Sequence, residues 1–218
     1  MYRLGIIRHT HERTLELCEK LVRKVCDRVE LVNEVPFSKA LEATYEIGSS
    51  ESDWVLVLDA DVLIKPDTFN FNLNNFTTPV VMTRCWDYYL GKDREAGVRF
   101  YRPDFMKANI KNINSSVVRP EANVILRNYS SSNVVTATHG EHQYYKDIIK
   151  SVLGIKNKHK RRLKEGIKYW ATQSNMDFRV MEQAVKLDVP GFIHTDKRTF
   201  DVLDNIMEEL GLREKVQL

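Results

Sequence analysis

The sequence predicts an α/β protein in which helices flank a central sheet, with a helical extension at the carboxyl-terminal end. Three observations indicate this class. Before residue 60, short apolar runs alternate with stretches whose apolar side chains recur at helical spacing. The run Trp54–Leu58 is apolar throughout, as in a strand that is buried on both faces of a sheet. From Glu141 onward the spacing is mainly helical.

The amino-terminal part has the order strand, helix, strand, helix, strand. Thr10 and Ser38 are residue types that cap helix amino termini, and Gly48 is suited to ending the second helix. This alternation is typical of a mononucleotide-binding half-sheet with right-handed crossovers. The five elements are a strand at residues 4–7, a helix at about 12–25, a strand at 29–32, a helix at 38–48 and a strand at 54–58.

The rest of the chain continues with strands and then helices. Pro103 opens one helix, because proline is favoured in a first helical turn. We expect one domain over residues 1–150 and a helical extension, packed on it, over residues 151–218. The expected elements are strands at 79–83 and 97–101, a helix at about 103–113, a short helix ending near 128, a strand at 133–138, and helices at 141–150, 176–187 and 199–210.

Composition and charge limit the class of protein. With 218 residues, of which 43% are hydrophobic, the chain suits a globular domain with a core. No apolar run is long enough to cross a bilayer and no signal-peptide pattern is present, so we expect a cytoplasmic protein. A net charge of +3 is too small to indicate nucleic-acid binding. Cys18, Cys26 and Cys85 have neither metal-ligand nor disulfide spacing, which predicts buried, inert thiols.

Positive charge gathers in one segment, Lys156–Arg162. A solvated helix face is the simplest explanation of such a run. A contact with an anionic membrane surface is the alternative, because basic clusters gain free energy near acidic lipids. In that case the protein would be peripheral at the membrane.

The most informative residues follow the third predicted strand. Asp59 and Asp61 are separated by one small residue and come directly after the apolar run. In open α/β sheets ligands bind beyond the carboxyl ends of the strands, so both carboxylates are expected at the binding edge. There they can share a divalent cation, or one can hold the ion while the other holds a ligand hydroxyl. A solvated strand end is the structural alternative.

The loop after the first strand lacks the glycine-rich pattern that holds phosphates in dinucleotide-binding folds and P-loops. Arg8, His9 and Thr10 stand there instead, and we expect them near the base and ribose of a bound nucleotide. Lys39, at the start of the second helix, is a candidate for a phosphate contact. Solvated surface positions explain Arg8 and Lys39 equally well.

Three features in a fixed order resemble a known family. Asp59-Ala60-Asp61 follows the apolar strand, Glu121 stands at a predicted helix start, and His139 comes 18 residues later at the end of a strand. In order and spacing, residues 3–150 resemble the GT-A-fold glycosyltransferases, and most of all the inverting, metal-dependent family 2 group. The resemblance implies a GT-A-like fold, with a Rossmann-like mixed central sheet and flanking helices. It also implies a nucleotide-sugar donor and bound Mn²⁺ or Mg²⁺.

The resemblance assigns roles to the matching residues. Asp61 and His139 would hold the cation, which neutralises the diphosphate leaving group. Asp59 would accept hydrogen bonds from the ribose. The family's usual aspartate after the second strand, which reads the base, is absent here, and Glu34 would take over that role. His142 is close to His139 in sequence. We select His139, because the expected helix at 141–150 places His142 in its first turn.

Glu121 is the expected catalytic base, which takes the proton from the acceptor hydroxyl. Family 2 members usually carry two adjacent acids where this chain has Pro120-Glu121. A glutamate in a first helical turn also complements the helix dipole, which is the structural alternative. Asp87 is the next candidate for the base, since it follows a strand in an aromatic segment suited to stacking on a sugar.

The expected activity is the transfer of one hexosyl or deoxyhexosyl group, with inversion, from a UDP-sugar to a glycan or lipid-linked glycan. The Gln-Arg-Arg-Trp signature of processive synthases is absent, which favours a single transfer. A haloacid dehalogenase-like phosphatase is an alternative, with Asp59 as nucleophile and Asp61 as acid, although its motif normally lies on the first strand. A sugar-nucleotide nucleotidyltransferase and a non-catalytic sugar-binding module are the others.

Overall fold

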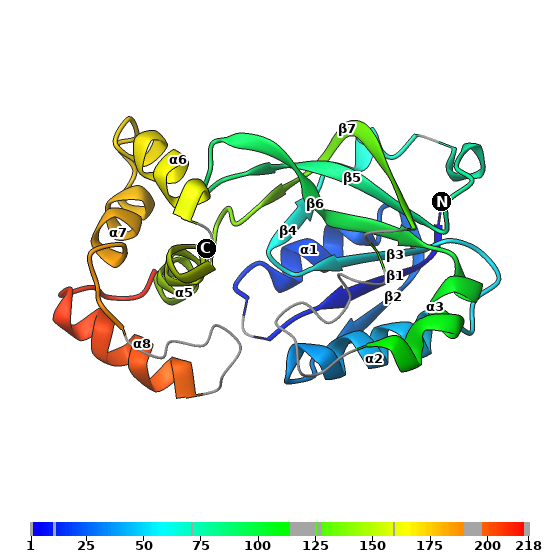
Figure 1. The fold of residues 1–218 in the computed structure, drawn as a ribbon, viewed down its shortest axis with the longest axis horizontal. Helices are drawn as coiled ribbons and strands as arrows, with labels where there is room; N and C mark the ends of the chain where they lie inside the picture. Colours follow the sequence, from blue (N-terminus) through cyan, green and yellow to red (C-terminus); the bar gives the residue numbers. More distant parts are fainter. Residues whose placement is uncertain are drawn as a thin grey trace. The chain divides into compact units, whose positions relative to one another are not determined.

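The protein forms two compact units in the computed structural model (Figure 1), which describes residues 2–10, 12–70, 72–113, 125, 128–158, 160–189 and 198–215. The first unit consists of Met1–Trp86 and Asp93–Glu141, and the second of Asp87–Lys92 and His142–Leu218. The second unit therefore takes in a short excursion between two strands in addition to the carboxyl-terminal helices.

A mixed seven-stranded sheet with the order β2-β1-β3-β6-β5-β7-β4 forms the centre of the first unit. β1 is parallel to β2 and β3, whereas β3 is antiparallel to β6, and β4 to β7. This arrangement confirms the predicted α/β class and its mixed central sheet. The strands are β1 (Tyr2–Arg8), β2 (Cys26–Val32), β3 (Val55–Asp59), β4 (Val62–Ile64), β5 (Val80–Asp87), β6 (Lys92–Tyr101) and β7 (Tyr129–His139).

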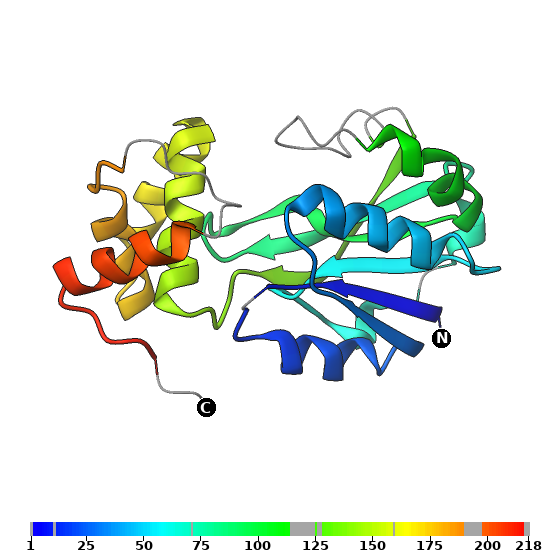
Figure 2. The same cartoon turned by 90° about the horizontal axis from the view of Figure 1, so that it is seen from below.

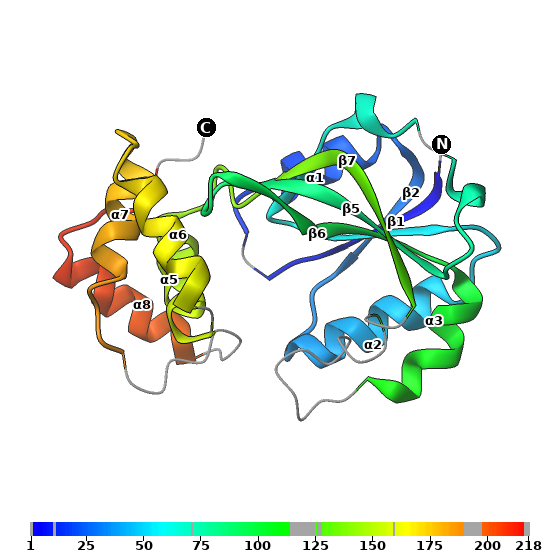
Figure 3. The same ribbon diagram turned by 45° about the horizontal axis from the view of Figure 1, so that its top comes forward.

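Helices cover both faces of this sheet. Figures 2 and 3 show α1 (Leu15–Val22) on one face and α2 (Phe37–Gly48) with α3 (Pro103–Asn109) on the other. β3 supplies side chains to both layers, because successive residues of a strand point to opposite faces. Leu56 and Leu58 belong to the core cluster under α1, and Val55 and Val57 to the cluster under α2. The continuous apolar run at 54–58 is thus explained by burial on both faces.

The second unit is a small helical bundle. Trp170 is fully buried in it, and its indole Nε1 donates a 2.7 Å hydrogen bond to the carbonyl oxygen of Tyr89. This bond ties the 87–92 excursion into the bundle, a connection that the sequence analysis did not predict. Its helices are α5 (Tyr145–Lys158), α6 (Lys160–Trp170), α7 (Met176–Ala184) and α8 (Arg198–Glu209).

Several predicted boundaries were wrong, and one strand was missed. β4 has three residues, too few for a periodic pattern, and the predicted helix at 103–113 ends at Asn109 and continues as a 3-10 turn, Ile110–Asn112. Further 3-10 turns lie at Pro66–Thr68 and Leu73–Asn75. The helix predicted from Glu141 begins only at Tyr145, and most of the short helix predicted to end near 128 lies outside the described residues.

The three cysteines are buried and form no disulfide bonds, as predicted. Burial raises the pKa of the Cys26 thiol to about 12. Burial also raises the pKa of the Cys18 thiol, and the nearby carboxylates of Asp61 and Asp59 raise it further. These thiols therefore stay protonated at neutral pH, which agrees with structural roles.

Candidate functional site

The candidate site lies at the carboxyl ends of the parallel strands, where Asp59 and Asp61 were expected. Arg8 of β1 stands opposite both Val32 of β2 and Asp59 of β3, so the three strands end at one edge of the sheet. Ala60 and Asp61 form the turn between β3 and β4. The short β4 returns the chain immediately, which fixes Asp61 at this edge.

Three hydrogen bonds from different elements hold this turn. The N–H of Ala60 donates to the carbonyl of Arg8 at 2.9 Å, and the hydroxyl of Thr14 donates to the carbonyl of Ala60 at 2.6 Å. The N–H of Gly140 donates to the carbonyl of Asp61 at 2.9 Å. Ala60 and Thr14 are buried, so the backbone between the two carboxylates is fixed before any ligand arrives.

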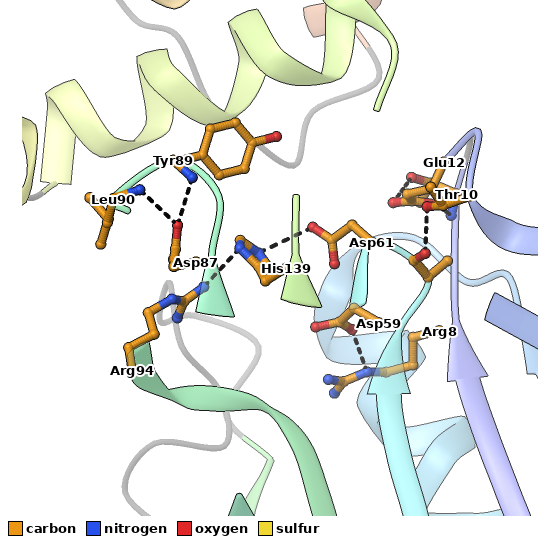
Figure 4. Close-up of polar contacts among 12 residues, drawn as sticks. Arg8, Thr10, Glu12, Asp59, Asp61, Asp87, Tyr89, Leu90, Arg94 and His139 are labelled. Carbon is orange, nitrogen blue, oxygen red and sulfur yellow. Dashed lines mark hydrogen bonds and ion pairs between the residues drawn. The ribbon is translucent and has the colours of Figure 1, made fainter. Parts of the chain in front are cut away.

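Asp59 is oriented by Arg8. The guanidinium Nε donates to Asp59 Oδ1 at 2.8 Å (Figure 4). The guanidinium carbon lies 5.0 Å from the ring centroid of Phe37. The Arg8 side chain is only 5% exposed, whereas that of Asp59 is 43% exposed. Arg8 therefore supports Asp59 from within the protein, and the Asp59 carboxylate faces solvent. A direct contact between Arg8 and a nucleotide stays a prediction.

Asp61 and His139 lie next to each other, although they are far apart in the sequence. His139 ends β7, which pairs with β4 so that Val62 stands opposite His139. The imidazole Nε2 is 3.3 Å from Asp61 Oδ2, and the two side chains are 19% and 27% exposed. Gly140 follows with a φ of +80°, a conformation that glycine adopts readily and that turns the chain away after the histidine.

Arg94 of β6 is a member of this site that the sequence analysis missed. Its Nη2 lies 3.2 Å from Nδ1 of His139, on the side of the ring opposite Asp61 (Figure 4). Nothing in the local sequence indicates this contact, because β6 and β7 are not adjacent in the sheet order.

Glu12, in the loop after β1, was missed as well. Its carboxylate accepts hydrogen bonds from the N–H of Thr10 at 2.6 Å and from the Thr10 hydroxyl at 3.1 Å.

The donor set fits a divalent cation that is completed by a substrate. Among the described residues, no group of three His, Cys, Asp or Glu side chains is placed to hold a metal ion. Asp61 and His139 supply one oxygen and one nitrogen at ligand-to-ligand spacing. Mg²⁺ commonly binds through one or two carboxylates, with substrate phosphates and water in the remaining positions. A phosphate-bearing ligand would complete the coordination of a cation at this pair.

The other predicted nucleotide contacts are at or near the surface. Glu34 is exposed after β2, and His9 and Thr10 are partly exposed after β1. Lys39, in the first turn of α2, forms a 2.5 Å ion pair with Glu42, whose hydrogen bond and charge raise the pKa of the lysine. A phosphate at Lys39 would have to compete with this pair. Nucleotide binding by these residues stays a prediction.

The structure describes only one of the two candidates for the catalytic base. Glu121 lies outside the described residues. Asp87, in the second unit, is 3% exposed, and its Oδ1 accepts hydrogen bonds from the N–H groups of Tyr89 at 3.0 Å and Leu90 at 3.2 Å. Such a side-chain-capped turn explains Asp87 as a structural residue. His142 lies in a turn with a φ of +64°, so the reason given for rejecting it, a place in a helix, was wrong.

The basic segment Lys156–Arg162 spans the end of α5 and the start of α6. Lys156 donates to the carbonyl of Leu187 at 2.5 Å, and Arg161 lies 3.8 Å from Glu165. Internal contacts therefore engage part of the segment, and a membrane-surface contact stays a prediction. Within the described ranges, no helix has both the length and the apolar character that crossing a membrane requires.

Comparisons with known proteins give structural similarities without a family assignment. No protein-family model matches the sequence, and no curated protein matches it significantly. Among solved structures, A197 from STIV is 13% identical, with 64% of this chain and 85% of that chain covered and a TM-score of 0.47. A glycosyltransferase involved in the glycosylation of the major capsid of PBCV-1 is 14% identical, with 63% and 94% covered and a TM-score of 0.44.

The glycosyltransferase GlyE of Streptococcus pneumoniae TIGR4 is also similar. It is 14% identical, with 100% of this chain and 67% of that chain covered and a TM-score of 0.41. Each of these TM-scores is below 0.5, so the similarities assign neither a family nor an activity to this chain.

Proposed function

We propose that this protein is a glycosyltransferase that moves one sugar from a nucleotide-sugar donor to the hydroxyl of an acceptor. The donor is a UDP-sugar, the acceptor is a glycan or lipid-linked glycan, and the reaction inverts the anomeric centre and needs Mn²⁺ or Mg²⁺. The observation that carries the proposal is the meeting of Asp61 and His139, 3.3 Å apart, beside the exposed carboxylate of Asp59.

In this reaction the residues of the sheet edge bind and orient the donor. Asp61 and His139 would hold the cation, which would supply positive charge to neutralise the departing diphosphate. Asp59 accepts hydrogen bonds from ribose hydroxyls, and Arg8 keeps its carboxylate in place. The rigid turn around Ala60 fixes the spacing between these two functions. Positioning of this kind lowers the barrier, because the groups need no reorganisation when the bond breaks.

A base completes the transfer. The acceptor oxygen attacks the anomeric carbon from the face opposite the diphosphate, and its proton passes to the base as the new bond forms. We assign this proton transfer to Glu121. The carboxylate of Asp87 is buried in a turn and accepts two backbone hydrogen bonds, which makes it a poor proton acceptor for an external hydroxyl.

A panel of sugar nucleotides tests the proposal. The protein is incubated with each nucleotide sugar and Mn²⁺, and the products are resolved as nucleoside diphosphate, inorganic phosphate or pyrophosphate. We expect release of a nucleoside diphosphate from one donor, faster in the presence of the correct acceptor. Inorganic phosphate alone would indicate a phosphatase with Asp59 as nucleophile, and pyrophosphate would indicate a nucleotidyltransferase. Ser52→Ala, in a loop between α2 and β3, serves as a control that should turn over like wild type.

A further inference from the structure

The ring of His139 lies between side chains of opposite charge. Arg94 Nη2 is 3.2 Å from Nδ1, and Asp61 Oδ2 is 3.3 Å from Nε2 (Figure 4). A guanidinium has donors only and stays charged in proteins, so Nδ1 must accept with its lone pair. A neutral imidazole carries its single proton on the other nitrogen. A neutral His139 ring with this contact to Arg94 would therefore carry its proton on Nε2, facing the carboxylate.

This hydrogen-bonding arrangement disfavours the binding of a cation by Asp61 and His139. A cation shared by Asp61 and His139 needs the lone pair of Nε2, and the ring proton then moves to Nδ1. Metal-binding histidines normally donate that proton to an oxygen acceptor. Here Nδ1 faces Arg94, and two N–H groups would point at each other. Arg94 has to move before His139 can bind a cation.

We propose that Arg94 is a positioning residue that holds His139 as the Nε2–H tautomer in the metal-free protein and competes with a divalent cation for the ring. This inference deepens the proposed function and rests on it. The diphosphate of a donor is an anion to which a guanidinium binds well, so it offers Arg94 another partner. Arrival of the donor then frees the ring, and cation binding through His139 becomes tight only in the presence of the donor.

NMR of the metal-free protein tests the tautomer directly. Long-range ¹H–¹⁵N correlations show which ring nitrogen carries the proton, and the His139 signals are identified by their loss in His139→Gln. We expect Nε2–H in wild type at neutral pH. In Arg94→Gln we expect a shift towards Nδ1–H, because the amide oxygen accepts from that nitrogen. A wild-type ring protonated on Nδ1, or the same tautomer ratio in both proteins, would overturn the proposal.

Binding of Mn²⁺ alone, followed by electron paramagnetic resonance of the free ion, tests the competition. We expect Arg94→Gln to bind Mn²⁺ about three- to tenfold more tightly than wild type, which is the effect of one lost hydrogen bond. Arg94→Met removes the charge without adding an acceptor and should fall between the two. Equal affinity in wild type and Arg94→Gln, including no detectable binding in either, would overturn the proposal.

Two controls separate the hydrogen bond from general charge. Arg84 on β5 donates to the carbonyl of Asp93 at 3.4 Å, and Arg84→Gln removes a positive charge from the same sheet. We expect it to change Mn²⁺ affinity by no more than about twofold, because Arg84 bonds to the Asp93 carbonyl rather than to His139, and water and salt screen its charge. A gain as large as that of Arg94→Gln would overturn the proposal. In a His139→Ala background the gain from Arg94→Gln should vanish, and its persistence would also overturn it.

Failure of this inference is distinguishable from failure of the proposed function. The tautomer belongs to the metal-free protein and is measured without any donor. If the tautomer and the Mn²⁺ effect are found but no sugar nucleotide is turned over, the proposed function fails and the role of Arg94 stands. If sugar is transferred but the tautomer is reversed, only the inference about Arg94 fails.

Discussion

The contact between Arg8 and Asp59 permits a quantitative prediction about which of the two binds a nucleotide. Arg8→Met keeps an apolar side chain beside Phe37 but removes the donor to Asp59. A hydrogen bond between charged groups contributes about 1.5–3 kcal/mol. The Asp59 side chain is 43% exposed, and solvent screening lowers the expected interaction to about 1–1.5 kcal/mol. We therefore expect a coupling free energy of that size between the two residues.

A double-mutant cycle measures this coupling. The free energy of unfolding is determined by urea denaturation for wild type, Arg8→Met, Asp59→Asn and the double variant. Nucleotide binding is then measured for the same four proteins. If Arg8 acts through Asp59, Arg8→Met should weaken binding in the wild-type background and have little effect when position 59 is Asn. A coupling free energy of unfolding below about 0.3 kcal/mol would refute the reasoning. Equal weakening of nucleotide binding in both backgrounds would also refute it, and would indicate that Arg8 contacts the nucleotide itself.

Three further predictions follow from the site and the core. Glu121→Gln should lower turnover to the acceptor by roughly two to four orders of magnitude, with little change in donor affinity. Turnover by this variant within about threefold of wild type would exclude Glu121 as the base. Thr14→Val should lower the free energy of unfolding, measured by urea denaturation, by about 1–2 kcal/mol, because the buried carbonyl of Ala60 loses its donor. An unchanged free energy of unfolding would show that the turn does not need this bond. The pKa values of the Cys18 and Cys26 thiols are raised by burial, so the folded state keeps protons that the unfolded state loses. The free energy of unfolding should therefore be constant below about pH 8 and fall above pH ~8.5, by about 1.4 kcal/mol per thiol at one unit above the unfolded pKa. Cys26→Ala should make this decline shallower in melts recorded between neutral pH and pH 10, and an equally steep decline would contradict the assignment.

The strand and helix order of the amino-terminal half could be predicted because its signals are local. The apolar run at 54–58 is dictated by burial of β3 on both faces, and the two carboxylates follow directly where the strand ends. The same reasoning placed His139 at the end of β7. The sequence therefore contained enough information to place the two carboxylates at the end of β3 and the histidine at the end of β7.

The remainder depends on contacts that no local pattern encodes. β4 exists because Val62–Ile64 pairs with β7, a partner far along the chain, and this pairing brings Asp61 to His139. Arg94 reaches His139 from a strand that is not a neighbour of β7. The burial of Arg8 could not be seen either, since an arginine after a strand is usually solvated. The late start of α5 follows from positive φ angles at Gly140 and His142, and the sequence indicates such a conformation only for the glycine.

The central claim is that Asp61 and His139 bind one cation together with the diphosphate of a nucleotide. A crystal of the protein grown with Mn²⁺ and UDP tests it most directly, because anomalous scattering locates the manganese independently of its ligands. We predict one anomalous peak within roughly 2.0–2.6 Å of both Asp61 Oδ2 and His139 Nε2, with diphosphate oxygens completing its coordination and Arg94 turned away from the ring. A manganese bound elsewhere, or UDP bound with Arg94 still on Nδ1 and no manganese at this pair, would contradict the claim.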